Sequence, residues 1–150
     1  MRQFLTLVDT HGQLIQREWF DRAESVHRQL HDHFPEGREA YYVLMMEIFQ
    51  NGGRMYVLVE DQMVKGVVVA RLIVDSRDKR HWHLDDVVVD QGCRDQGIGQ
   101  ALLRHMEEEA RARNCQAITL DSRVARERAH RFYFREGFMV KSFHFLKNCY

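Results

Sequence analysis

Residues Val87 to Leu103 read VVVDQGCRDQGIGQALL, and the rest of the chain is arranged about this stretch. A β-branched apolar run leads into a polar turn, Gly97 and Gly99 follow, and an amphipathic pattern begins directly after them. This order predicts a strand, a loop and a helix. A helix N-terminus offers free N–H groups and a partial positive charge, and glycine lets a ligand approach the backbone closely. The stretch is therefore a candidate anion-binding site.

Two other phosphate-binding patterns fit this stretch poorly. A triphosphate-binding P-loop carries Lys-Ser or Lys-Thr after its glycines, and neither dipeptide follows Gly99. A dinucleotide fold has the spacing G-x-G-x-x-G, but Leu102 stands at the place of the third glycine. The remaining alternative is a turn that only starts a helix and binds nothing.

Two motifs resemble the GCN5-related N-acetyltransferases (GNAT). The pattern R-x-x-G-x-G at residues 94–99 is similar to the Gln/Arg-x-x-Gly-x-Gly/Ala loop with which that family holds the pyrophosphate of acetyl-coenzyme A. The pattern A-x-x-F-Y-x-x-x-G-F at residues 129–138 looks like the family's downstream helix and strand. The resemblance covers residues 54 to 147, whereas the first 50 residues match only in general layout.

The resemblance also implies which residues bind acetyl-coenzyme A, the expected co-substrate. Backbone groups just before the loop would align the pantetheine arm and the acetyl group, and residues 95–100 would hold the pyrophosphate. Arg126 stands where many members have a cofactor-contacting asparagine, and an arginine there could reach a phosphate. The expected cofactor-binding residues are Val87, Val88, Val89, Arg94, Asp95, Gln96, Gly97, Ile98, Gly99, Gln100 and Arg126.

Acetyl transfer to an amine needs a group that removes the amine proton, because an amine with a pKa of about 10 arrives protonated. Strict alternation along residues 81–89 puts His83 and Asp85 on one face and Asp86 on the other. The family's bases tend to fall on the face of His83 and Asp85. Histidine ordinarily titrates near neutral pH, whereas an aspartate base would need a raised pKa or would orient a water. The alternative is that both are ordinary half-exposed strand residues, and Asp86 is expected to be structural, bonding a nearby helix end.

Tyr133 is the expected acid. It matches the tyrosine that, in many members, protonates the departing coenzyme A sulfur; the alternative is an aromatic packed in the core. The family also walls its acceptor site with the loop between the first two helices, so Phe34, Tyr41 and Tyr42 are candidates for contacting the acceptor.

Composition bounds the number of domains, the class of partner, the location and the metal content of the protein. The chain has 150 residues, long enough for one domain over residues 1–150, with 22 basic and 22 acidic residues. This balance favours neither nucleic acid nor a membrane as a partner. No membrane span or secretory signal is expected. Three cysteines without paired spacing predict free thiols and a cytoplasmic protein. The nine histidines complete no ligand set, so no metal site is expected.

Periodicity predicts an α/β chain whose elements follow the GNAT order. The resemblance implies a GNAT fold, a mixed and mostly antiparallel sheet flanked by helices on both faces. The predicted strands cover residues 4–8, 55–60, 64–74, 81–90, 117–120 and 138–147, and the predicted helices cover residues 16–32, 40–50, 98–113 and 124–135.

The expected activity is transfer of an acetyl group from acetyl-coenzyme A to a primary amine of a small molecule by direct attack. Two alternatives stay open: an acetyltransferase acting on proteins or peptides, and a coenzyme A-binding regulatory module without turnover. The sequence names neither the acceptor nor the oligomeric state. The segment Phe143–Leu146 is a candidate for strand pairing across a homodimer.

Overall fold

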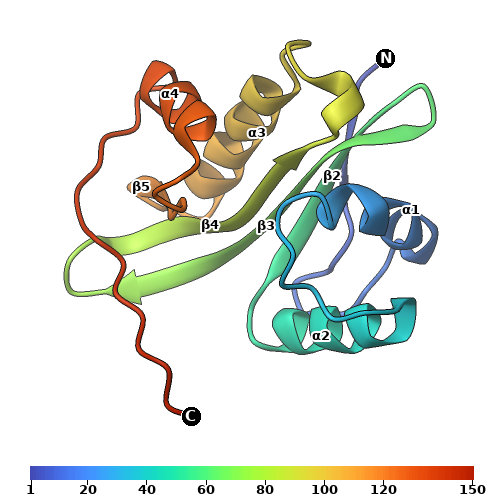
Figure 1. The fold of residues 1–150 in the computed structure, drawn as a ribbon, viewed down its shortest axis with the longest axis horizontal. Coiled ribbons are helices and arrows are strands. Elements are labelled where there is room, and N and C mark those ends of the chain that lie inside the picture. Colours follow the sequence, from blue (N-terminus) through green and yellow to red (C-terminus); the bar gives the residue numbers. More distant parts are fainter. The chain divides into compact units, whose positions relative to one another are not determined.

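The helices and strands follow the predicted order as far as residue 135 in a computed structural model that describes residues 1–150 (Figure 1). The elements are β1 (Gln3–Thr6), α1 (Arg17–His27), α2 (Arg38–Gln50), β2 (Arg54–Glu60), β3 (Met63–Asp75), β4 (Lys79–Val89), the 3₁₀ turn η1 (Gln91–Cys93), α3 (Ile98–Ala112), β5 (Ala117–Leu120) and α4 (Glu127–Arg135). The chain divides into two compact units, Met1–Thr119 and Leu120–Tyr150. A single domain over residues 1–150 stays a prediction.

One sheet contains all five strands in the order β1-β2-β3-β4-β5. The first four strands pair antiparallel with their neighbours. The Gln116 N–H donates to the Arg80 carbonyl at 3.0 Å, and Thr119 lies against His83. Residue numbers therefore rise together in β4 and β5, which makes this pair parallel. The predicted mixed, mostly antiparallel sheet is confirmed.

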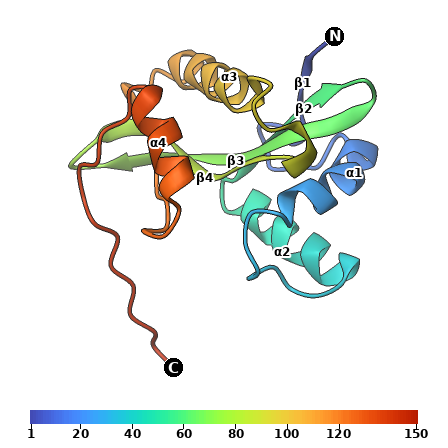
Figure 2. The ribbon, with the colours of Figure 1, turned by 45° about the horizontal axis from the view of Figure 1, so that its top comes forward.

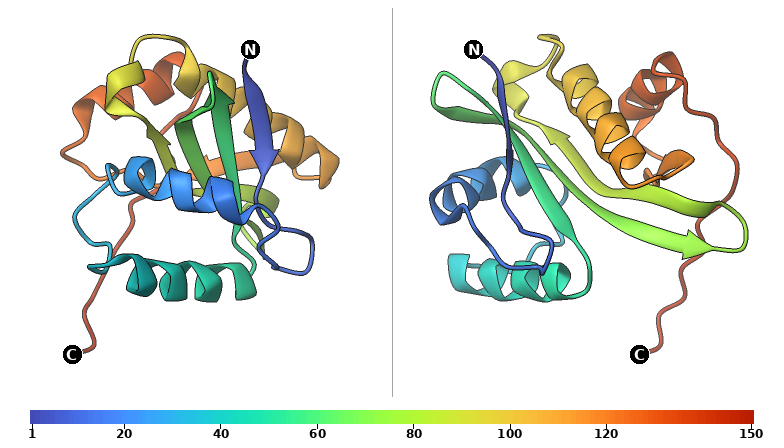
Figure 3. Two further views of the ribbon diagram at one scale, coloured as in Figure 1. Left: turned by 90° about the vertical axis from the view of Figure 1, so that its right-hand side faces the viewer. Right: turned by 180° about the vertical axis from the view of Figure 1, so that it is seen from behind.

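Helices cover both faces of the sheet, as predicted. Figure 2 shows α3 on one side of β3 and β4, with α1 and α2 on the other, and Figure 3 shows the same layers from two further directions. Apolar side chains of α1 and α2 build the larger core with alternate residues of β2 and β3. Its buried members include Phe20, Val26, Met45, Phe49, Met55, Val57, Val67, Val69 and Val88.

The face under α3 is packed differently. The buried side chains of α3 are Ile98, Leu102, Leu103, Met106 and Ala110, which recur at helical spacing. Gly66 of β3 lies beneath this stripe, and a β-carbon there would come within 2.7 Å of Leu102 Cδ1. The helix therefore packs tightly on the sheet at a position where the strand has no side chain.

A β-bulge interrupts β4 and corrects the predicted alternation. Val69 pairs with Asp86 and Ala70 with Leu84, so Asp85 has no backbone pairing partner on β3. Before the bulge, Trp82 packs near Tyr56 and Arg113 on the α3 side. After it, Asp86 reaches α1. The prediction that Asp86 lies on the face opposite His83 is wrong because the extra residue reverses the alternation of the strand.

Two predicted boundaries are also corrected. No regular structure forms over residues 138–147, where Phe143 and Phe145 are 81% and 89% exposed. Alternation signals an amphipathic segment, but a strand also needs a neighbouring strand to complete its hydrogen bonds. The first helix ends at His27 rather than residue 32, because the Arg28 side chain donates to the Pro35 and Gly37 carbonyls and the chain turns back. No helix in the structure combines the length and apolar character needed to cross a membrane.

Candidate active site

The glycine loop ends in a left-handed turn at the start of α3. Gly97 has φ +76° and is the residue directly before the helix. A side chain there would be strained, although a β-carbon would meet nothing closer than an Arg2 nitrogen at 3.8 Å. The first N–H groups of α3 have no carbonyl within the helix to bind. The predicted residues 95–100 therefore form an open, N–H-lined turn at the positive end of a helix dipole.

Arg2 is a neighbour of this loop that the sequence did not indicate. Its guanidinium donates to the Gln96 carbonyl and to Glu60 Oε2, the latter at 2.9 Å. The contact brings a positive charge beside the loop from the far end of the chain. Only the folded structure could reveal it, because 94 positions separate Arg2 from Gln96.

The three valines before the loop lie at the end of β4. Val88 is buried in the core beneath α1, whereas Val87 and Val89 are half-buried. β5 has four residues and contacts β4 at Arg80 and His83. β4 is longer than β5, so its stretch from Asp85 to Val89 extends beyond β5. The backbone groups on that edge of β4 are available for a ligand.

His83 and Asp85 come together at the bulge. His83 Nε2 lies 3.7 Å from Asp85 Oδ1, and its Nδ1 hydrogen-bonds the Thr119 hydroxyl at 2.7 Å. Both oxygens of Asp85 accept from the Nε of Arg71, at 3.2 and 2.9 Å. Arg71 pairs with His83 across the strands. The structure thus gathers the two predicted base candidates with a guanidinium that neutralises one of them.

A buried chain of hydrogen bonds links α2, α1 and β4 on the same face. Tyr41 Oη lies 2.7 Å from Nδ1 of His27, and Nε2 of His27 lies 2.7 Å from Oδ2 of Asp86. Burial raises the pKa of Tyr41, so this phenol keeps its proton. Asp86 does bond the end of a helix, as predicted. Tyr41 is fully buried, and so it reaches an acceptor only through its partners.

Tyr133 and Arg126 belong to the second unit, whereas the other predicted site residues belong to the first. Tyr133 is 8% exposed and packs edge-on against Phe138, with ring centroids 5.6 Å apart. Burial raises the pKa of its phenol, and the positive charge of Arg126 opposes this shift. Arg126 directly precedes α4. A tyrosine in this state holds its proton at neutral pH and can donate it.

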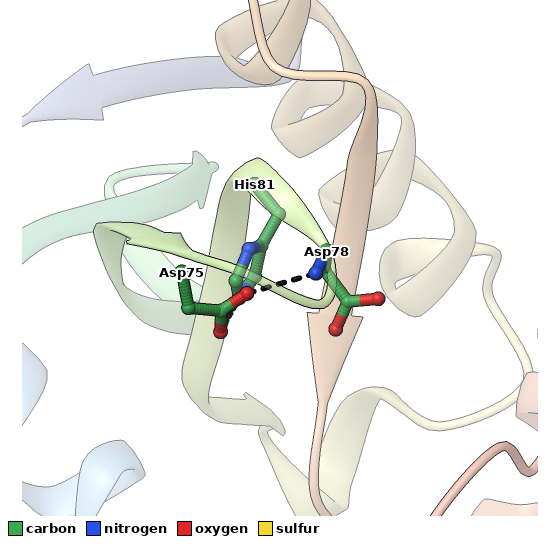
Figure 4. A group of neighbouring side chains, drawn as sticks. All are labelled: Asp75, Asp78 and His81. Carbon is green, nitrogen blue, oxygen red and sulfur yellow. Dashed lines mark hydrogen bonds and ion pairs between the residues drawn. The ribbon is translucent and has the colours of Figure 1, made fainter.

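Three side chains at the β3–β4 hairpin, Asp75, Asp78 and His81, offer metal-ligand atoms that lie within 4.8 Å of one another (Figure 4). Asp75 Oδ1 accepts the backbone N–H groups of Arg77 and Asp78, at 3.1 and 2.8 Å. The N–H of Asp78 is the main cause that lowers the pKa of Asp75. The carboxylate therefore closes the hairpin turn, and the group lies at the opposite end of β4 from the glycine loop.

Comparison with known proteins gives a consistent picture. Residues 14–138 match the model of the acetyltransferase (GNAT) family. The chain is 41% identical over 64 residues to aminoalkylphosphonate N-acetyltransferase of Salmonella typhimurium. It is 30% identical over 115 residues to glucosamine 6-phosphate N-acetyltransferase 1 of Oryza sativa subsp. japonica, covering 72% of this chain and 67% of the relative.

The fold matches solved structures over nearly the whole chain. Aminoglycoside N-acetyltransferase AAC(6')-Iy in complex with CoA superposes with a TM-score of 0.77 at 15% identity, covering 99% of this chain and 96% of that one. The sequence match to the Salmonella relative spans 43% of this chain and 42% of the relative. The chain likewise spans only 46% of a second relative, an uncharacterised N-acetyltransferase of Methanocaldococcus jannaschii.

Proposed function

The chain belongs to the acetyltransferase (GNAT) family, and on that premise we propose that it transfers the acetyl group of acetyl-coenzyme A to a primary amine of a small molecule. One observation carries the proposal. The open, N–H-lined turn at Gly97 and the unpaired edge of β4 lie one after the other along the chain. The first suits a pyrophosphate and the second suits the amide groups of a pantetheine arm.

The cofactor contacts follow from this arrangement. Backbone N–H groups of residues 95–100 bind the pyrophosphate, with Arg94 and Gln100 beside them, and backbone groups of Val87 to Val89 align the thioester. Asp95 has φ +64° and contributes to the turn through its backbone. Arg126 supplies a positive charge for a phosphate of the cofactor. No metal takes part in this scheme.

In the proposed reaction the amine nitrogen attacks the thioester carbon, the carbon–sulfur bond breaks, and the thiolate leaves. His83 takes the amine proton, directly or through a water. Asp85 faces His83 and is paired with Arg71, so it orients the imidazole or the incoming ammonium. Tyr133 donates the proton of its phenol to the departing sulfur. The remaining proton of the attacking nitrogen restores the Tyr133 phenol, and the products are the acetylated amine and coenzyme A.

The acceptor class is supported by the relatives' names. Two of them act on amines that carry phosphonate or phosphate, and a structural neighbour acts on aminoglycosides. These are small molecules rather than proteins. We also propose a cytoplasmic location, supported by three free cysteine thiols. A homodimer that pairs the exposed segment 143–146 stays a prediction, and size-exclusion chromatography with light scattering tests it.

Calorimetric titration with acetyl-coenzyme A tests the proposal, with ATP and NAD as controls. Micromolar binding of acetyl-coenzyme A alone is the expected result. A thiol-release screen over amines, aminosugars, polyamines and peptides then identifies the acceptor, and release with peptides only would replace the small-molecule assignment. Absence of acetyl-coenzyme A binding would refute the loop assignment and the enzyme assignment with it. Binding without release for any amine would leave the regulatory alternative in its place.

A further inference from the structure

The Tyr41–His27–Asp86 chain is a group of buried polar side chains that the proposed chemistry does not yet use. His27 is fully buried, yet both of its ring nitrogens have a partner at 2.7 Å. Phe34 packs edge-on against the imidazole, with ring centroids 4.6 Å apart. An imidazole held on every side has one orientation, and Asp86 is fixed by it.

For a neutral His27 imidazole, hydrogen-bond chemistry sets the direction of each bond in this chain. A carboxylate only accepts, so Nε2 of His27 carries the proton that bonds Asp86. Nδ1 of a neutral imidazole then accepts, and the Tyr41 hydroxyl donates to it. All three groups are satisfied without an additional proton. His27 occupies Oδ2 of Asp86, which leaves its second oxygen, Oδ1, for another partner.

The position of Asp86 allows its Oδ1 oxygen to bind a ligand beside the base candidates. Because of the bulge, Asp86 lies on the same face of β4 as His83 and Asp85, and its side chain is 19% exposed. Arg71 already neutralises Asp85. On the neighbouring helix, Glu24 pairs with Arg28 at 2.8 Å and lies 3.6 Å from Arg38. Asp86 is therefore a carboxylate of this face that no guanidinium pairs with.

We propose that Asp86 binds the ammonium group of the acceptor, and that His27 and Tyr41 are positioning residues that aim its carboxylate. This inference rests on the proposed function, since an amine acceptor arrives as a cation at neutral pH. Asp86 holds the protonated amine next to the bulge, and the amine gives its proton to His83 before attack. Charge-assisted hydrogen bonds of this kind are shorter and stronger than neutral ones.

The binding test needs no turnover. Propylammonium chloride is titrated at neutral pH into the full chain labelled with ¹⁵N at histidine, with 1-propanol as the uncharged control. The His27 Nε2 resonance, assigned with a His27→Gln variant, is expected to shift saturably with propylammonium alone. Asp86→Asn should abolish the shift. Asp78→Asn, which removes the same charge at the far end of β4, should retain it.

Kinetics with an amine found by the thiol-release screen give the second readout. Asp86→Asn should raise the KM for the amine about tenfold to a hundredfold, the range expected for a lost hydrogen bond to a charged group. Asp86→Glu should restore part of this loss. His27→Gln and Tyr41→Phe should raise the same KM by less and leave kcat at saturating amine unchanged, which a general loss of structure would not do.

The outcomes separate this inference from the function on which it rests. If acetyl-coenzyme A binds and amines are acetylated, but Asp86→Asn leaves both the amine KM and the NMR titration unchanged, the ammonium site is refuted and the function stands. If acetyl-coenzyme A fails to bind, the function falls, and the propylammonium titration still decides whether Asp86 binds cations. Circular dichroism of each variant identifies any that fails to fold, and Asp86→Glu then carries the test.

Discussion

Replacing Gly66 with alanine tests the contact that seats α3, and with it the glycine loop, on the sheet. A β-carbon at Gly66 would lie 2.7 Å from Leu102 Cδ1 and 3.2 Å from Ile98 Cγ2. The first distance is 0.7 Å below the 3.4 Å at which ordinary contact begins. Leu102 is fully buried and Ile98 is 1% exposed, so neither side chain can swing into solvent. Either the helix moves or both side chains leave their preferred rotamers.

The expected cost follows from these contacts. Overpacking a close-fitted core costs about 1–3 kcal/mol. Alanine restricts the unfolded chain more than glycine, which offsets about 0.4–1 kcal/mol because Gly66 does not need a positive φ. The net loss of unfolding free energy is therefore between about 0 and 2.6 kcal/mol, or a Tm lowered by up to about 10 °C for a chain of this length. Since Ile98 begins α3, acetyl-coenzyme A affinity should fall as well.

A double-mutant cycle measures the contact directly. Urea denaturation gives the unfolding free energy of Gly66→Ala, Leu102→Ala and the double variant. Leu102→Ala alone creates a cavity and costs about 2–5 kcal/mol. In the double variant the new methyl enters that cavity, so its loss should be smaller than the sum of the single losses by about 1 kcal/mol or more. Losses that add within about 0.5 kcal/mol would refute the packing argument.

Three further predictions address the loop, the acid and alkaline stability. Gly97→Val should abolish acetyl-coenzyme A binding in calorimetry, whereas Gly52→Val, at a comparable φ of +96° remote from the loop, should cost about 1–3 kcal/mol of stability and leave binding intact. Tyr133→Phe should lower kcat about 100-fold with little change in acetyl-coenzyme A affinity, and an unchanged kcat would remove Tyr133 from the mechanism. Burial raises the pKa values of Tyr41 and Tyr56, so the folded state holds these protons more tightly than the unfolded chain. Their contribution is complete below about pH 10 and is lost as the pH rises further, so the Tm should fall above that pH, and less so in Tyr56→Phe.

Much of the fold was predictable because packing leaves a periodic trace in the sequence. Helix α3 buries Ile98, Leu102 and Met106 at the expected spacing, and β5 has the predicted bounds, Ala117–Leu120. The strand predicted at residues 138–147 shows the limit of the same signal. Alternation reports how a segment would present its side chains, but not whether a neighbouring strand is there to accept its hydrogen bonds.

The site was predictable in part, for a different physical reason. A loop motif lies in consecutive residues, so the turn at Gly97 could be located from the sequence alone. The bulge could not be located in this way, because no residue type marks the unpaired position in this strand. His27 fits the apolar stripe of its helix and is indistinguishable there from a core residue. Its partners Tyr41 and Asp86 are 14 and 59 positions away.

The unpaired residue in β4 decides which face every later side chain of the strand points to. Compared with strict alternation along the sequence, each residue after it lies on the other face. Trp82 faces α3, whereas Asp86 and Val88 face α1. Deleting residue 85 would leave Leu84 opposite Ala70 and Asp86 opposite Val69, so the pairing would become regular and Asp86 would still face His27. Val88 would stay opposite Val67 and in its core. The deletion would therefore remove the carboxylate beside His83 and keep every later side chain of the strand on its present face.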